Sequence, residues 1–280
     1  MSVKIIIDST ADVRGELRDK FIIVPLTVSF GEEQFVDGVT INHRQFYEKL
    51  VESDVMPTTS QPSPEAFERV FRELVENGDE AVVLTISSSL SGTYQSATIA
   101  RENLEGKIFV VDTRSVTIGS GILAELALSL ANEGFSAREI AERITKEREN
   151  VRVIALLDTL EYLKRGGRIS KTVAFAGGLL SIKPVLCIMD GEIAILGKAR
   201  GSKQGNNFLT TEIQKSGGVN FDKPLLLGYT GLSDALLEKY KEDSQELWQP
   251  YKKNLYSEVI GSVVGTHAGP NGIAVAFFCK

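Results

Sequence analysis

The sequence is poor in the residues that build metal centres and disulfides. It contains two cysteines, Cys187 and Cys279, and two histidines, His43 and His267. Each cysteine lies inside an apolar run, and no Cys-x-x-Cys spacing occurs. We therefore expect no disulfide framework, no metal site and no other cofactor, and the cysteine usage favours a reducing cytoplasm.

Long hydrophobic runs and an excess of basic charge are also missing. No apolar run approaches the ~18 residues that a transmembrane helix needs, so we expect no membrane span, although transient membrane contact remains compatible with the sequence. The amino terminus enters an apolar, strand-like run at once and leaves no room for a signal peptide, which again favours the cytoplasm. The net charge of −6 argues against non-specific binding of nucleic acid, because a polyanion needs a basic face.

What the chain does have is a hydroxyl-rich stretch at residues 85–97. The apolar run 81–84 before it is typical of a buried strand, and residues 94–103 after it suit a helix. In an open α/β sheet, ligands bind at such a junction, where a helix amino terminus offers free N–H groups to an anion. The hydroxyls of Ser88, Ser89, Ser91 and Thr93 would add donors suited to a carboxylate or a phosphate. The alternative is that they merely cap the helix.

Two further predicted strands end in the same way. Residues 3–7 lead into Asp8-Ser9-Thr10-Ala11-Asp12, and residues 107–111 lead into Asp112-Thr113. Strands and helices alternate up to a buried strand at 153–157, which is typical of right-handed βαβ units and a parallel sheet. Because the carboxyl ends of parallel strands share one edge, we expect a polar, anion-tolerant rim there.

The remaining patterns predict a two-domain α/β protein, with an N-terminal, mainly parallel sheet with flanking helices and a C-terminal mixed-sheet α/β domain. We place the domains at residues 1–162 and 163–280, because two glycines and a basic cluster fall near the boundary. In the first domain we expect a strand at 22–28, a hairpin arm near 26–41 and a helix at 44–51. A polar loop at 56–64 and helices after Ser63-Pro64, at 121–131 and after Ser136 complete that domain. In the second we expect a hairpin around Asp190-Gly191, then a helix at 208–215, strand–helix–strand at 225–229, 232–248 and 256–264, and a final strand at 273–278.

Five short motifs in order make the sequence resemble a known family. They are Asp8-Ser9-Thr10-Ala11-Asp12, Thr59-Ser60-Gln61-Pro62-Ser63, Leu90-Ser91-Gly92-Thr93-Tyr94, Gly166-Gly167-Arg168-Ile169-Ser170 and Thr266-His267-Ala268-Gly269-Pro270. The chain resembles the DegV family of bacterial fatty-acid-binding proteins, the lipid-carrying subunits of fatty acid kinase. One departure is Asn271 after the last motif, where the family commonly has Gly; Asn tolerates a positive φ, so we expect the turn to survive.

The resemblance implies the site and the partner. One long-chain fatty acid would lie between the domains, its carboxylate held by the hydroxyls of Thr59 and Ser91, with Arg168 and His267 in the same polar cluster. Ser60 and Gly92, neighbours in the matching motifs, complete the expected ligand-binding set. A kinase subunit would phosphorylate the presented carboxylate to an acyl phosphate, and Lys171 and Arg200 are the expected partner contacts. Taken alone, Arg168 could also be a solvated loop cation, His267 a structural turn histidine, and the basic residues around Arg200 a solvated face.

The acyl tail needs an apolar tunnel. Burying ~14 methylenes at ~0.8 kcal/mol each contributes ~11 kcal/mol before entropic costs, so the tail should set affinity and the head orientation. The candidate lining is the apolar segments 122–130 and 173–180 together with Ile188, although for any single residue of this kind ordinary core packing is the more frequent role.

Two enzyme classes compete with the carrier. A hydrolase would use Ser91 as nucleophile and His267 as base, but Ser91 lacks the Gly-x-Ser-x-Gly pattern of a nucleophile elbow. A nucleotide or sugar-phosphate enzyme would need Gly-x-Gly-x-x-Gly or a Walker lysine after a strand, and neither is present. We therefore expect a binding subunit without catalytic machinery of its own.

Overall fold

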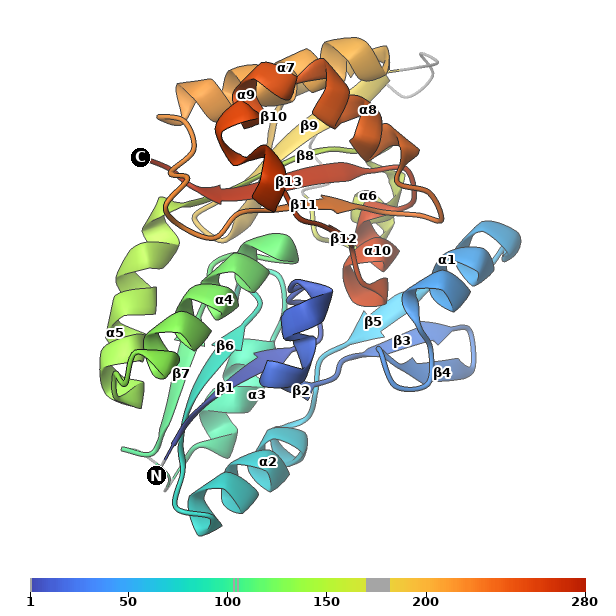
Figure 1. The fold of residues 1–280 in the computed structure, drawn as a ribbon. Coiled ribbons are helices and arrows are strands. Elements are labelled where there is room, and N and C mark those ends of the chain that lie inside the picture. Colours follow the sequence, from blue (N-terminus) through green and yellow to red (C-terminus); the bar gives the residue numbers. More distant parts are fainter. Residues whose placement is uncertain (1, 103, 105, 170–181) are drawn as a thin grey trace.

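The chain forms two stacked sheet layers with a small third sheet at one side (Figure 1). The structure is a computed structural model that describes residues 2–102, 104, 106–169 and 182–280. A four-stranded parallel sheet lies toward the amino terminus and a six-stranded mixed sheet toward the carboxyl terminus. The predicted two-domain α/β class, with one mainly parallel and one mixed sheet, is confirmed.

The parallel sheet has the order β2-β1-β6-β7. Its alternating side chains divide between two cores. Ile6 and Val83 pack with Phe67 of α2, whereas Ile7 and Leu84 pack on the opposite face under α4 and α5. This period of two is what a strand buried on both faces requires. The elements are β1 (Val3–Asp8), β2 (Ile22–Val24), β6 (Glu80–Thr85), β7 (Ile108–Asp112), α2 (Pro64–Glu76), α3 (Thr93–Ala100), α4 (Ile118–Asn132) and α5 (Ala137–Glu147).

The mixed sheet has the order β10-β9-β8-β13-β11-β12. One face carries Ile154 and Leu156 and is covered by α7, α8 and α9. The other face carries Val153 and Ala274, which join the core around α4, so this helix lies between the two sheets (Figure 1). The elements are β8 (Val151–Leu156), β9 (Ile182–Met189), β10 (Glu192–Arg200), β11 (Leu226–Tyr229), β12 (Ser257–Val259), β13 (Ile273–Phe278), α7 (Gly201–Lys215), α8 (Ala235–Asp243) and α9 (Gln245–Trp248).

The expected place of the strand at 153–157 was wrong. This segment, β8, lies antiparallel to β13 and β9 in the mixed sheet and does not extend the parallel one. Its residues are buried or half-buried on both faces, and that pattern does not specify which sheet receives the strand. The domain boundary near residue 162 stays a prediction.

The arm near residues 26–41 differs from its prediction in two ways. Pro25 interrupts the strand expected at 22–28, so β2 stays in the parallel sheet while β3 (Thr27–Phe30) pairs with β4 (Glu33–Val36). The loop expected at 56–64 contains β5 (Thr58–Ser60), which places Thr59 opposite Val28. The helix α1 (His43–Glu52) packs on this small sheet through Phe46.

The strand predicted at 256–264 was also wrong in its second half. After β12 the chain turns into the helix α10 (Ser262–Ala268), which begins after Gly261. Val263 is buried in the core of the arm, so tertiary packing overrides the strand preference of its β-branched side chain. His267 therefore lies in the last turn of a helix, not on a turn. The short helix α6 (Glu161–Arg165) contacts α10.

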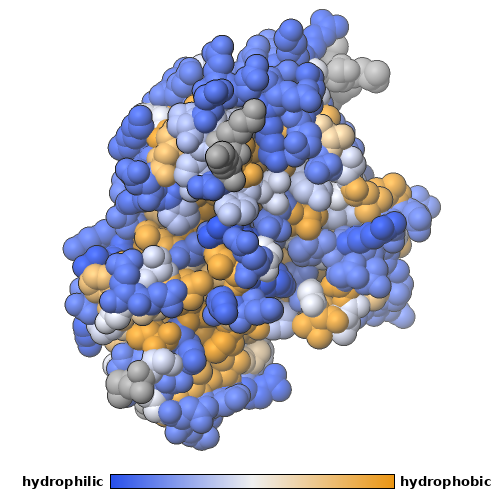
Figure 2. All heavy atoms as spheres, viewed as in Figure 1, coloured by the Kyte–Doolittle hydropathy of each residue, from blue (hydrophilic) through white to orange (hydrophobic). Residues whose placement is uncertain are grey.

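Polar residues cover most of the face in Figure 2. The most extended group of hydrophobic residues lies over the four-stranded sheet, and smaller groups lie elsewhere. Across the described ranges, no helix is both long and apolar enough to cross a membrane.

Candidate functional site

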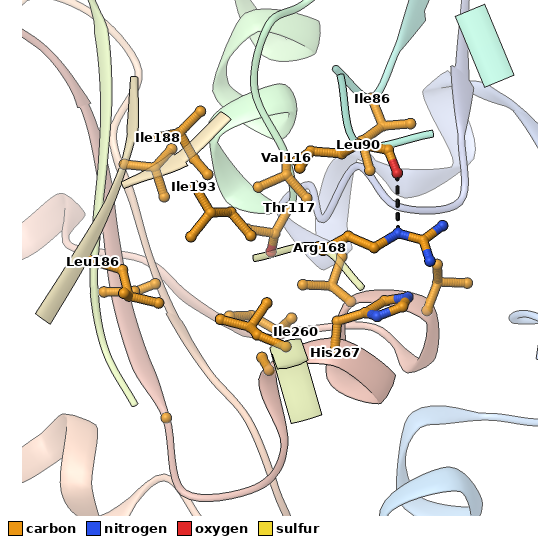
Figure 3. A pocket seen from close by; sticks show the side chains of 18 of the residues that line it. Ile86, Leu90, Val116, Thr117, Arg168, Leu186, Ile188, Ile193, Ile260 and His267 are labelled. Carbon is orange, nitrogen blue, oxygen red and sulfur yellow. Dashed lines mark hydrogen bonds between the residues drawn. The ribbon is translucent and has the colours of Figure 1, made fainter. Parts of the chain in front are cut away.

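A cavity of about 350 Å³ lies between the two sheets, within the range typical of small-molecule sites. The mixed sheet and α10 form one wall, and the loops after β6 and β7 form the other. The polar cluster gathers at one end, where Arg168 and His267 lie side by side, and Ile188 and Ile193 face them across the space (Figure 3). The predicted residues that line the cavity are Thr59, Ser60, Ser91, Arg168, His267 and Ile188.

Two carboxylates, one buried and one half-buried, fix the hydroxyl-rich loop. Oδ2 of Asp8, a fully buried residue, accepts the backbone N–H of Ile86 at 2.7 Å. Asp112 accepts the backbone N–H and the hydroxyl of Ser88 at 3.2 and 2.6 Å. The three strand ends thus meet at one edge as expected. Asp8 and Asp112, at the ends of β1 and β7, bond backbone N–H groups of the loop after β6, and other groups face the ligand.

Thr59 and His267 form a linked pair. The Thr59 Oγ1 lies 2.9 Å from His267 Nε2, and the buried Nδ1 has no partner among the described residues. Burial, followed by the charge of Arg168, lowers the pKa of His267 to about 4, so the ring is neutral at physiological pH. A neutral ring carries one proton. If the proton is on Nε2, the ring donates to Thr59 and the Thr59 hydroxyl proton is free for an anion. If the proton is on Nδ1, which is buried beside Gly166, the Thr59 hydroxyl donates to the ring instead.

Arg168 supplies the positive charge of the cluster. Its Nε donates to the Leu90 carbonyl at 3.2 Å (Figure 3). Its Nη1 donates to the Gly166 carbonyl at 2.7 Å. These two bonds hold the guanidinium beside the hydroxyl-rich loop, and its remaining N–H groups can donate to a carboxylate. Gly166 is also required for space, because a Cβ there would lie 2.1 Å from Nδ1 of His267.

The start of α3 faces the same cluster. Gly92 is its N-cap, and the first N–H groups of a helix have no intrahelical partner. The Ser91 hydroxyl lies 2.9 Å from Thr93 Oγ1. Gly92 does not itself line the cavity, but a Cβ on it would overlap Gln61, which does. Gln61 bonds Ser96 at 3.0 Å and so joins the arm to α3. The glycine therefore lets the arm approach the helix start.

The rest of the cavity is mainly apolar. Its walls come from short loop segments and strands, and include Ile86, Leu90, Val116, Leu186, Ile188, Ile193 and Ile260. The prediction that residues 122–130 line the tunnel was wrong: Ile122, Leu123 and their neighbours are buried core between the sheets. Only the residues just before α4, Val116 and Thr117, reach the cavity. The second predicted lining segment, 173–180, lies outside the described residues.

The structure describes one of the two predicted partner-facing residues. Arg200 is exposed at the end of β10, opposite Ile182 in the strand register, and does not line the cavity. Lys171 lies outside the described residues. Sequence reasoning missed Gln61 and Thr117 as lining residues, although Gln61 lies within one of the matching motifs.

Asp12 holds two walls of the cavity together. Its Oδ2 accepts the hydroxyl of Thr117 at 2.5 Å, and its Oδ1 accepts the N–H of Gly261 at 3.0 Å, immediately before α10. Thr117 has a φ of 50°, an uncommon conformation that this bond helps to hold. Burial raises the pKa of Asp12 from 3.8 to about 7, and nearby Asp37 adds to the rise.

We expect Asp12→Asn to change how stability depends on pH. Because the folded-state pKa of Asp12 is raised, the wild type loses stability as the pH rises from about 4 to about 7, and the variant lacks that loss. Across this pH interval, the free energy of unfolding of the variant should rise relative to that of the wild type by at most ~4 kcal/mol. Urea unfolding at several pH values measures it, and parallel curves would show that Asp12 does not titrate there.

Comparisons with known proteins place this geometry in context. A family model described as an uncharacterised protein of the DegV family matches residues 2–280. A DegV domain-containing protein of Caldanaerobacter subterraneus is 36% identical over an alignment of 279 residues that covers 98% of this chain and 98% of its own. The structure of a DegV family protein from Thermus thermophilus, described by its fatty acid binding, superposes with a TM-score of 0.87 at 30% identity over 100% of both chains. The structure of a stearic acid-binding protein from Eubacterium ventriosum superposes with a TM-score of 0.85 at 30% identity, over 100% of this chain and 99% of its own.

Proposed function

Because the chain belongs to the DegV family, we propose that it binds one long-chain fatty acid between its sheets and presents the carboxylate to a partner kinase. The observation that carries this proposal is the composition of the cavity. Donors gather at one end, where Thr59 contacts His267 and Arg168 bonds Leu90 next to Ser91, and apolar side chains line the rest. A molecule with one anionic end and one long apolar end matches such a cavity. Ser60 and Gly92 border the same head-group end.

The charges support a carboxylate at this end. With His267 neutral, Arg168 is the cation that meets the ligand, so one negative charge balances the cluster. Thr59 adds one donor when His267 donates to it through Nε2, and Ser91 and the start of α3 can add others. The head group is thereby oriented by hydrogen bonds, while the tail supplies most of the transfer free energy.

The geometry favours the carrier over a serine hydrolase. A nucleophile and its base need a hydrogen bond between them. Here the Ser91 hydroxyl contacts Thr93, while His267 contacts Thr59. The family relation supports the same choice, because the related structures are described by fatty acid binding. In this proposal the chain uses no cofactor, and phosphorylation of the carboxylate to an acyl phosphate belongs to the kinase.

Ser91→Ala tests the head-group assignment. We expect palmitate to bind ~1–2 kcal/mol more weakly, about 5- to 30-fold in Kd, because one hydrogen bond to a charged group is lost. The methyl ester of palmitate should bind both proteins nearly equally, since it carries no negative charge. Fluorescence displacement or calorimetry gives both constants.

Ser89→Ala is the matched control for Ser91→Ala. Ser89 lies in the same loop, but it is exposed and does not line the cavity, so its loss should leave both ligands unaffected. If Ser91→Ala bound the acid as tightly as the wild type does, Ser91 would not contact the head group.

A further inference from the structure

A second hollow of about 450 Å³ lies where β8 and β9 separate. β8 pairs with β13 along its whole length, but with β9 only at residues 154–156. Beyond Cys187 the end of β9 pairs with β10 in the hairpin. The two strands therefore diverge at this end of the sheet, and residues from both faces of β8 line the gap.

This hollow shares a wall with the fatty-acid cavity. Val153, Cys187 and Ile188 line both spaces. Val153 belongs to the core between the sheets, whereas Cys187 packs on the opposite face with Ile154. Figure 3 places Ile188 across the cavity from Arg168 and His267. The shared wall is therefore at the end of the cavity that lies away from the polar cluster.

Apolar and charged side chains both line the hollow, and its basic residues outnumber its acidic ones. Lys215 pairs with Glu212 at 2.7 Å, while Arg114 and Arg148 both pair with the same carboxylate oxygen of Glu149 at 3.2 and 3.3 Å. Asp190, at the hairpin turn, is the third acidic group among the lining residues.

Arg152 is the cation without a carboxylate partner. Its Nη1 donates to the backbone carbonyls of Glu149 and Val151 at 2.7 and 2.9 Å, and it forms no ion pair within the described ranges. Its charge also reaches the shared wall. Burial and Glu212 raise the pKa of the Cys187 thiol, while Arg152 acts in the opposite direction. The guanidinium is thus close to a side chain that lines the fatty-acid cavity.

We propose that this hollow receives a second carboxylate, at the far end of a long-chain dicarboxylic acid whose first carboxylate occupies the polar cluster, and that Arg152 binds it. The inference rests on the proposed fatty-acid site. In an otherwise apolar cavity a terminal carboxylate would be buried without a partner, at a large cost. A chain long enough to pass the wall at Cys187 and Ile188 brings that carboxylate to a hollow in which basic residues outnumber acidic ones.

The test compares two series of ligands. Dissociation constants are measured for saturated monocarboxylic and α,ω-dicarboxylic acids of increasing length, at pH 8, where both carboxylates are ionised. For short chains the diacid should bind at least ~100-fold more weakly than the monoacid of equal length, because its second charge is buried. At one threshold length the difference should fall to less than ~10-fold, because the second carboxylate then reaches Arg152.

Three variants assign the effect to Arg152. Arg152→Gln should restore a penalty of at least ~10-fold for the long diacids and leave the monoacids unchanged, because it removes the cation. Arg152→Lys keeps the charge and should retain most of the diacid binding. Arg72→Gln removes an exposed arginine on α2, paired with Glu68 outside both spaces, and should change neither series. Thermal unfolding of each variant checks that the fold is retained.

The outcomes separate this inference from the proposed function. If monoacids bind but the diacid penalty persists at every length, the hollow does not receive a carboxylate. The same holds if Arg152→Gln weakens both series equally. If monoacids themselves fail to bind, the proposed function is wrong and this inference falls with it.

Discussion

Palmitate is expected to bind this protein about four orders of magnitude more tightly than octanoate. The two acids present the same carboxylate to Arg168, Thr59 and Ser91, so the head-group contribution cancels. They differ by ~8 methylenes, and burying these at ~0.8 kcal/mol each contributes ~6 kcal/mol before the cost of ordering the chain. Isothermal titration calorimetry across even-numbered acids should show affinity rising with length until the cavity is full, and then levelling.

A substitution in the apolar wall gives the control for this series. Ile193, a half-buried residue on β10 that points into the cavity, becomes an obstacle in Ile193→Trp, which shortens the space for the tail. The variant should lose affinity for palmitate while octanoate changes little, because only the longer chain reaches the wall. Equal affinities for octanoate and palmitate in the wild type would contradict the tail site altogether.

The elements that the sequence predicted well are those with local causes. Asp190 and Gly191 both have positive φ, as the expected hairpin turn requires. Ser136 and Glu139 form the expected capping box. Asn271 has a φ of 61°, so it takes the left-handed conformation that its place after Pro270 suggested. In each case the residues within a few positions determine the backbone.

The errors fall where distant contacts decide the structure. α10 begins where Asp12, far away in the chain, accepts the N–H of Gly261, and no local pattern reports that bond. β5 exists because β3 pairs with it across the arm. These two elements carry His267 and Thr59, which line the cavity. The motifs drew attention to both residues, while local reasoning gave the wrong backbone around them. The hydrogen bond between the two side chains could be seen only once both elements were placed.

The cavity lining shows the same division. Ile188 was predicted and lines the cavity, whereas the strongly apolar segment 122–130 was predicted and lies in the core instead. Hydrophobicity reports that a residue avoids water, but it does not distinguish close packing against protein from contact with a lipid chain. The lining residues come largely from loops and sheet faces that meet only in the folded chain.

Addition of a kinase of the matching family with ATP and palmitate should yield acyl phosphate, while this chain alone should consume no ATP. The sequence lacks a Walker lysine, and no group of acidic, histidine or cysteine side chains in the described part of the chain could hold a metal ion. Robust ATP consumption with palmitate and no partner would contradict the proposed division of labour.

Arg200→Glu tests the proposed partner face. In the presence of the kinase, turnover should fall at least ~10-fold while palmitate binding stays unchanged, because reversing a charge at the edge of an interface mainly affects association. The variant should fold, because Arg200 is the exposed N-cap of α7 and an acidic side chain there is favourable for the helix dipole. Its backbone N–H keeps its bond to Gln204. Arg72→Glu makes the same charge change at an exposed site on α2 and should leave turnover intact. Equal losses of binding and turnover in Arg200→Glu would place Arg200 at the lipid site, because a residue that contacts only the kinase cannot alter affinity for the acid in the kinase's absence.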